Sequence, residues 1–313
     1  MLAVRELTVR YDAGRRARVR TAVDSVTFEL AAGESLGLVG ESGSGKSSLV
    51  RALLRLVPAS GVALFEGRDL LRLRGTDLRA TREHLQIIFQ DPLAALDPRM
   101  RIAEIVAEPL REFRPQLPAS ERRALARSML ERVGLDATHL DRYPHEFSGG
   151  QAQRIGIARA LVLRPRLLLC DEPVASLDVS ITAQIVNLLH DLKREFGLSL
   201  LFIAHDLATV RQVCERVMVL YRGRLMEIAP REQLYSAARH PYTRALLAAV
   251  PTPDPAHAGP AALAVGEPGT APTEPGGCAF RHRCPLSAAR CSTEIPQLRA
   301  AGSGLVACHF ADS

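Results

Sequence analysis

The sequence predicts an α/β fold with a parallel sheet, and three observations indicate it. Short apolar runs at 35–39, 167–170 and 199–204 are typical of strands that are buried on both faces. A glycine-rich turn follows the first run and leads into a helical pattern at 48–54. A second helical pattern, at about 181–195, joins the other two runs into a β-α-β unit.

Two smaller parts accompany this core. Alternating apolar and polar residues between 2 and 39 predict short strands and hence a small antiparallel β subdomain. The stretch from about 99 to 163 is mostly helical in pattern, which predicts a helical subdomain. A hairpin is expected at 216–229, turning near Gly223.

Composition limits the class of protein. The chain has 313 residues, of which 47% are hydrophobic, enough for one large α/β domain with an appendage, or for two domains. Aromatic residues make up 4% and tryptophan is absent, which argues against nucleic-acid binding by base stacking. Residues 1–9 alternate like a strand rather than a signal peptide, and no apolar run approaches the ~20 residues of a membrane span. We expect a protein that is soluble, or peripheral to a membrane through a partner.

The glycine-rich turn matches the phosphate-binding pattern G-x-x-x-x-G-K-[ST] between strand and helix. Glycines let the backbone approach anionic oxygens, and successive N–H groups form an anion nest at the start of the helix. A glycine turn that contains a lysine by chance is the alternative, and the flanking strand and helix argue against it. We expect Lys46 to reach the β- and γ-phosphates and Ser47 to ligate Mg²⁺. The loop consists of Gly40, Glu41, Ser42, Gly43, Ser44, Gly45, Lys46 and Ser47.

Two adjacent carboxylates, Asp171 and Glu172, end the apolar run at 167–170. Asp171 can hold Mg²⁺, directly or through water, and Glu172 can act as the general base toward the attacking water. An acidic helix cap is the alternative. Gln90 and His205 each end an apolar run in the same way, where ligands bind in open α/β sheets. Gln90 could bridge Mg²⁺ and water, and His205 could contact the γ-phosphate.

A second glycine pair, in Ser148, Gly149, Gly150 and Gln151, precedes another helical pattern. Ser148 is a favourable N-cap, and a helix N-terminus behind two glycines can bind an anion. An ordinary glycine-containing helix start is the alternative. Since one chain needs a single phosphate loop, the second site suggests a dimer in which these residues close over the nucleotide of the partner.

These motifs, with Ser176-Leu177-Asp178, occur in the order and spacing of ABC transporter ATPase subunits, which the chain therefore resembles. The resemblance implies two ATP molecules held between head-to-tail nucleotide-binding domains. It also implies that Tyr11 stacks on adenine and that Asp178 connects the two sites. The catalytic set expected on this basis is Glu172, His205, Gln90 and Lys46. The expected nucleotide-binding set adds Tyr11, Ser48, Gln90, Asp171, Asp178 and Ser148–Gln151 to the phosphate loop.

A finer resemblance is to ATPases of oligopeptide/dipeptide importers, a group that also serves nickel and glutathione uptake. It rests on 89–99, 171–180 and 240–251 and on the terminal cysteines. It implies uptake of peptides or a related solute, a second ATPase subunit, two permease subunits, an extracytoplasmic solute-binding protein and a place on the cytoplasmic face of the membrane. The alternatives are a soluble ABC ATPase in DNA repair or translation and a regulatory module without turnover. The solute cannot be read from this chain, and no nucleic-acid partner is expected.

The domain boundaries expected on this basis are 1–235 for the nucleotide-binding domain, with its helical subdomain at about 91–163, and 236–313 for a C-terminal extension. A Pro/Gly/Ala-rich linker is expected at 251–277. The extension contains Cys278, Cys284, Cys291 and Cys308.

Four thiols in a segment without a secretion signal predict a metal centre, either zinc or an iron–sulfur cluster. The tight cysteine pairs that zinc favours are absent, and the importer resemblance implies a 4Fe–4S cluster. Zn²⁺ and free thiols are the alternatives, with His282 and His309 as other ligands. We expect the centre to be structural, since the segment is too short for a core of its own.

Overall fold

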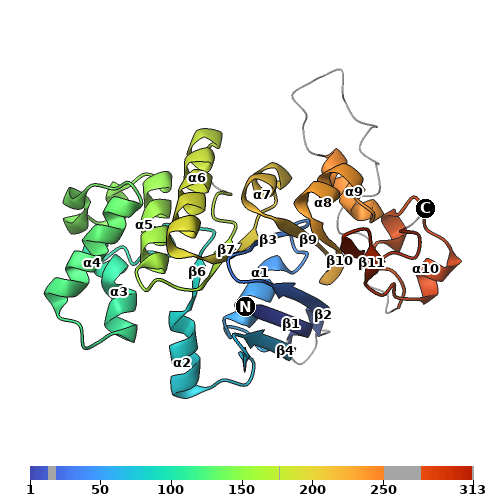
Figure 1. Ribbon diagram of the computed structural model, residues 1–313, viewed down its shortest axis with the longest axis horizontal. Coiled ribbons are helices and arrows are strands. Elements are labelled where there is room, and N and C mark those ends of the chain that lie inside the picture. The colour runs from blue at the N-terminus through green and yellow to red at the C-terminus, as the bar shows by residue number, and fades with distance from the viewer. Residues whose placement is uncertain (13–18, 176, 250–275, 312–313) are drawn as a thin grey trace. The chain divides into compact units, whose positions relative to one another are not determined.

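The computed structural model describes residues 1–12, 19–175, 177–249 and 276–311 of the chain (Figure 1). They form two compact units: Met1–Leu2, Leu30–Ser35 and Leu64–Ala204 make the first, and Ala3–Glu29, Leu36–Ala63 and His205–Ser313 the second. Except for Gly276 and Gly277, the predicted linker lies outside the described residues.

Three parallel strands form the centre of the first unit. They are β6 (Leu85–Ile88), β7 (Leu167–Asp171) and β8 (Ser199–Ile203). β7 lies in the middle, with Leu167 opposite both Leu85 and Ser199. Every residue of β7 and β8 is buried, as the unbroken apolar runs predict. β6 ends at Ile88, so Gln90 lies two residues beyond the strand that it was expected to end.

Most of the rest of this unit is helical, and α3, α4 and α5 lie side by side (Figure 1). The amphipathic pattern of α3 buries Ile102, Ile105, Val106 and Leu110, and it contacts both of the other helices. In α2 only Thr81 is buried, so the sequence has no apolar periodicity from which this helix could be predicted. The elements are β5 (Arg68–Asp69), α2 (Gly75–Glu83), α3 (Ile102–Phe113), α4 (Ala119–Arg132), the 3-10 turns η1 (Ala137–Asp141) and η2 (Pro144–Glu146), α5 (Gly149–Leu161) and α6 (Val179–Phe196).

The second unit has two groups of strands. In the first group, β1 (Leu2–Tyr11) lies between β2 (Arg20–Leu30) and β4 (Ser60–Phe65). In the second, β3 (Ser35–Val39) runs parallel to β9 (Arg216–Tyr221), which forms the expected hairpin with β10 (Arg224–Pro230). The phosphate loop leads from β3 into α1 (Lys46–Leu53).

Strand pairing attaches the cysteine-containing segment to this second group. β12 (Gly304–Val306) pairs with β10 and with β11 (Arg299–Ala301). Ala301, Val306, Cys308 and Ala311 form an apolar cluster against which Phe310 packs. We expected a thiolate cluster alone to stabilise this segment. That expectation did not include the strand pairing with β10 or the apolar cluster. The helices of this part are α7 (Leu207–Val213), α8 (Arg231–Ala237), α9 (Pro241–Ala248), η4 (Arg281–Arg283) and α10 (Ala289–Thr293).

A buried glutamate holds the start of α9. Glu227 follows a bulge in β10, is 1% exposed, and accepts hydrogen bonds from the backbone N–H groups of Arg239 and His240 at 2.9 Å each. His240 is the N-cap, and its Nδ1 accepts from the N–H of Tyr242 at 3.0 Å. Burial lowers the pKa of His240 to about 4 from its ordinary 6.5, so the imidazole is neutral near pH 7.

This shift predicts a pH-dependent stability. As the pH falls from 6.5 toward 4, His240 becomes protonated in the unfolded chain but stays neutral in the folded chain. The free energy of unfolding therefore falls by up to about 1.4 kcal/mol per pH unit. Asparagine can keep the cap without titrating. Urea unfolding between pH 7.5 and 4.5 should therefore give a steeper pH slope for the wild type than for His240→Asn, and equal slopes would contradict this.

Two glycines of the phosphate loop should differ in how much stability is lost when each is replaced by alanine. Gly45 has φ +108°, and a Cβ there would lie 2.2 Å from the carbonyl oxygen of Ala22. Gly43 has φ +73° with nothing within 4 Å of its Cβ position. Gly43→Ala should cost about 1–2 kcal/mol of unfolding free energy for its left-handed backbone. Gly45→Ala should cost clearly more, because a backbone carbonyl must move. Denaturant titration of both variants measures the difference, and similar losses would contradict the steric argument.

Candidate functional site

The phosphate loop passes close to backbone atoms on two sides. A Cβ at Gly40 would lie 2.1 Å from the carbonyl oxygen of Leu220, and a Cβ at Gly45 would lie 2.2 Å from that of Ala22. Lys46 is buried, and its ammonium group donates to the carbonyl oxygens of Gly40 at 2.9 Å and Glu41 at 3.1 Å. The lysine is thus held over the start of its own loop.

This geometry fits a Mg²⁺-bound triphosphate. A Cβ at Gly40 or Gly45 would clash with a backbone carbonyl oxygen, so only glycine fits at these two positions. The ammonium group of Lys46 is held at the start of the same loop. The eight-residue helix α1 begins at Lys46, so its free N–H groups and the positive end of its dipole are at the loop. The Tyr11 hydroxyl donates to Ser48 Oγ at 3.2 Å, which brings together two residues expected near the nucleotide. Stacking of Tyr11 on adenine stays a prediction.

The acid pair lies at the end of β7 in the first unit. Asp171 is the last residue of that strand and is 6% exposed. Glu172 follows with φ +50°, a left-handed backbone that is rare outside glycine and is found often at functional sites. The amide of Gln90 donates to the Glu172 carboxylate, with 3.0 Å between Nε2 and Oε2. Gln90 and Glu172 are 82 residues apart, and the structure brings them into contact.

The second glycine pair begins α5, as predicted. Ser148 Oγ accepts from the N–H of Gln151 at 3.4 Å, and Gln151 Oε1 accepts from the N–H of Ser148 at 3.0 Å, which is a reciprocal capping box. A Cβ at Gly150 would lie 2.7 Å from Ile181 Cγ2, so glycine is required for the packing of α5 on α6. Ser148 and Gly149 are exposed, so a partner molecule can reach them.

Asp178 caps α6 within its own chain. Its Oδ1 accepts from the N–H of Ile181 at 2.9 Å and from the Ser180 hydroxyl at 2.7 Å. The first of these bonds contributes most to a lowered Asp178 pKa, so the residue is ionised near pH 7. A local helix cap thus accounts for this aspartate in the folded monomer. Its expected role in connecting two nucleotide sites stays a prediction.

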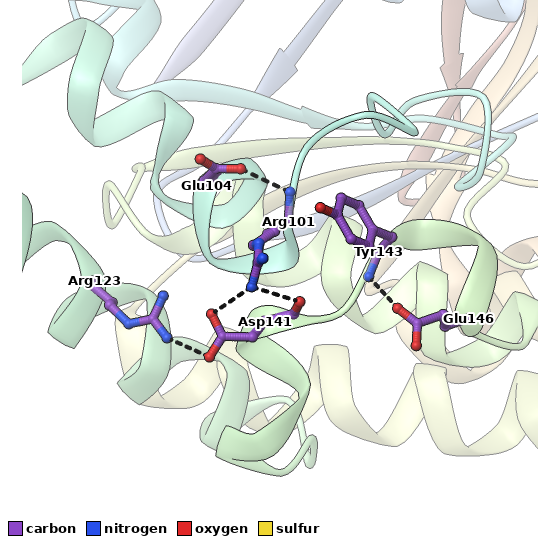
Figure 2. Close-up of polar contacts among 6 residues, drawn as sticks. All are labelled: Arg101, Glu104, Arg123, Asp141, Tyr143 and Glu146. Atoms are coloured by element: carbon purple, nitrogen blue, oxygen red, sulfur yellow. Dashed lines mark hydrogen bonds and ion pairs between the residues drawn. The ribbon is translucent and has the colours of Figure 1, made fainter.

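A polar network supports the turns before Ser148 (Figure 2). Asp141 bonds to Arg123 at 2.8 Å, and Arg101 Nη1 lies 3.5 Å from the same carboxylate. Arg101 also lies over the ring of Tyr143, whose N–H donates to Glu146 at 2.6 Å. The network joins the starts of α3 and α4 to the segment that leads into the capping box.

His205 is exposed and lies in the second unit, just before α7. The next residue, Asp206, is the N-cap of that helix and accepts from the N–H groups of Ala208 and Thr209. This capping fixes the backbone beside His205. Its contact with a γ-phosphate stays a prediction.

The four terminal cysteines are free thiols with raised pKa values where a shift is resolved. Burial is the main cause, and the pKa of Cys284 rises to about 11, with the other three cysteines opposing its ionisation as well. The thiols of Cys278, Cys284 and Cys308 are therefore protonated at neutral pH. Among the described residues, however, no group of three or more His, Cys, Asp or Glu side chains is placed to hold a metal ion. The predicted iron–sulfur or zinc centre, with His282 or His309 as other ligands, has no support in this geometry.

Two residues at the phosphate loop were not predicted as part of the site. Tyr242 Oη accepts the N–H of Glu41 at 2.9 Å, and Arg283 Nη1 contacts the Glu41 carboxylate oxygens at 2.8 and 3.0 Å. These partners are separated from Glu41 by 201 and 242 residues. No local pattern could have identified them, although Tyr242 lies in one of the stretches that carry the importer resemblance.

Comparison with known proteins gives matches at two levels. The ABC transporter family matches residues 23–175, and the family "Oligopeptide/dipeptide transporter, C-terminal region" matches 226–291. The chain is 28% identical to an ATP-binding cassette solved as a dimer in a post-hydrolysis state with ADP and Pi, with a TM-score of 0.67 over 74% of this chain and 98% of the other. A cassette of a cbiONQ transporter complex from Clostridium perfringens matches with a TM-score of 0.66 and 28% identity, over 75% of this chain and 90% of the other.

Curated relatives match over almost the whole chain. The oligopeptide transport ATP-binding protein OppF of Escherichia coli is 50% identical over 92% of this chain and 87% of the relative. A putative peptide import ATP-binding protein of Brucella ovis is 49% identical over 96% of this chain and 94% of the relative. The chain therefore belongs to the ABC transporter ATPases, in the group that carries the oligopeptide/dipeptide transporter C-terminal region.

Proposed function

We propose that the chain hydrolyses ATP to drive uptake of di- or oligopeptides, or a related solute, through separate permease subunits. The observation that carries this proposal is the combination of a phosphate loop at 40–47 with the C-terminal region of oligopeptide/dipeptide transporters at 226–291. Relatives named for oligopeptide transport and peptide import share half of its residues. A DNA-repair or translation ATPase is not favoured by these relatives.

In this proposal the second unit binds the nucleotide. Lys46 exchanges its two carbonyl partners for β- and γ-phosphate oxygens, and Ser47 is a ligand of Mg²⁺. When bound, Mg²⁺ would offset the negative charge that develops during phosphoryl transfer. The glycines exclude side chains from the cradle, and the N-terminus of α1 stabilises the anion without reorganisation.

The first unit supplies the groups that act on water. Glu172 accepts a proton from the attacking water, and Gln90 restrains its carboxylate by the hydrogen bond at 3.0 Å. Asp171, at the end of β7, contributes to the Mg²⁺ site. Glu172 has a left-handed backbone, which is a costly conformation for a residue with a side chain and one that function can explain. A regulatory module without turnover would need neither feature.

Partners follow from the exposed capping box and from the family. Ser148, Gly149 and Gly150 of one subunit close over the ATP of another, either a second copy or a different ATPase. Two permease subunits and an extracytoplasmic solute-binding protein complete the importer. None of the helices in the described ranges has the length and hydrophobicity that a membrane span requires. We propose that the chain binds the permeases at the cytoplasmic face, with its nucleotide-binding domain at 1–235 and its extension at 236–313.

Replacement of Glu172 by Gln tests the catalytic proposal. Loss of the general base should slow ATP hydrolysis by ~10²–10⁴ while ATP still binds. Glu131→Gln is the matched control, because Glu131 is an exposed carboxylate paired with Arg127 on α4. Steady-state phosphate release and equilibrium ATP titration separate the two steps. Near-normal turnover in Glu172→Gln would contradict the assigned role.

A metal centre at Cys278, Cys284, Cys291 and Cys308 is a separate proposal. It rests on the spacing and on the importer resemblance, and the described geometry does not support it. On the resemblance we expect iron together with acid-labile sulfide after anaerobic purification. Zinc alone would support the alternative, and well-folded protein without metal would reject both.

A further inference from the structure

Glu41, the second residue of the phosphate loop, is held at three points. Its N–H donates to the Tyr242 hydroxyl at 2.9 Å, and its carbonyl oxygen accepts from Lys46 at 3.1 Å. Both carboxylate oxygens accept from the same nitrogen of Arg283, at 2.8 and 3.0 Å. Tyr242 and Arg283 both belong to the part of the chain that follows the nucleotide-binding core.

Aromatic packing fixes these two side chains. The rings of Tyr221, Tyr242 and Phe280 lie 4.5–5.3 Å apart between centroids. The guanidinium of Arg283 lies 5.8 Å from the ring centroid of Tyr221 and 5.7 Å from that of Phe280. Tyr242 is 1% exposed, and the Arg283 side chain is 16% exposed. The side chains of Tyr242 and Arg283 are therefore both held firmly by their neighbours. A change in the position of the extension would thus also change the contacts of the phosphate loop.

Charge gives this contact a consequence for nucleotide binding. The loop must accept an anion of several charges, and an unpaired carboxylate at Glu41 would repel it. Because the pair is largely shielded from solvent, with side chains 16% and 26% exposed, the repulsion would be screened less than between surface groups. Arg283 neutralises the carboxylate. Glu41 also holds Lys46 through its carbonyl oxygen, so its position and that of the phosphate-binding ammonium are linked.

We propose that Arg283 and Tyr242 are positioning residues for the phosphate loop, so that affinity for MgATP depends on the folded C-terminal extension. Arg283 compensates the charge of Glu41, and Tyr242 fixes the backbone of the same residue. The proposal rests on the ATP-binding assignment. It adds the C-terminal extension, which belongs to a different family region from the core, to the parts of the chain that determine nucleotide affinity.

The decisive comparison is between Arg283→Gln and Arg290→Gln. Arg290 lies in the same segment and pairs with Glu294 through side chains that are 60% and 55% exposed, so it is a matched control. The probe is a non-hydrolysable ATP analogue with Mg²⁺, titrated calorimetrically well below the melting temperature of each variant. Arg283→Gln should weaken binding about tenfold, the effect of one charge-assisted hydrogen bond, and Arg290→Gln should not.

A double variant separates charge compensation from loss of structure. Glu41→Gln combined with Arg283→Gln removes both charges, and its affinity should return to within about threefold of the wild type, since the electrostatic part is non-additive. Tyr242→Phe keeps the ring and removes only the oxygen that accepts from Glu41, and should weaken binding about threefold.

Equal affinities for Arg283→Gln and Arg290→Gln would overturn the proposal. A defect in Arg283→Gln that the double variant does not relieve would overturn it as well, because the arginine would then act only on folding. Unchanged binding in Tyr242→Phe would overturn the part assigned to the tyrosine. If the wild type fails to bind the analogue, the ATP-binding assignment itself is wrong, which is a different result from any of these.

Discussion

The phosphate loop depends on close approach between backbones. Leu220 of β9 and Ala22 of β2 place carbonyl oxygens where the side chains of Gly40 and Gly45 would otherwise be. The N–H of Gly223, at the tip of the hairpin, donates to the carbonyl oxygen of Ser44 at 2.7 Å. These contacts involve main-chain atoms, so they fix the loop whatever the neighbouring side chains are. The glycines are therefore needed twice, for the approach of the phosphates and for the packing of the loop on the strands behind it.

Features with a local cause could be predicted from the sequence. The buried strands β7 and β8 follow from unbroken apolar runs, and the start of α5 follows from Ser148 and Gln151, which cap it reciprocally. The hairpin at Gly223 follows from a glycine between two apolar runs. In each case the residues that determine the element lie within a few positions of it. The same holds for the phosphate loop, whose pattern contains its own chemistry.

Other features depend on partners that are distant in sequence. Gln90 lies beyond β6, and only the fold brings its amide to Glu172. The short strands β11 and β12 carry little β signal of their own, and they form because β10 offers an edge to pair with. The thiols of this segment suggested that metal binding must replace a missing core. Instead, Ala301 and Val306 join an apolar cluster, and the strand pairing supplies backbone hydrogen bonds.

Two kinds of contact therefore determine the shape and the charge of the phosphate loop. Main-chain packing at Gly40 and Gly45 sets its shape, and this leaves little room for variation. The charge at its start is set by side chains, Glu41 with Arg283, and charged pairs can be altered without moving the backbone. A carboxylate beside an anion site is unfavourable unless a cation accompanies it. The carboxylate of Glu41 is therefore compatible with nucleotide binding when Arg283 of the extension neutralises it. The extension is thus part of the nucleotide-binding structure rather than an appendage to it.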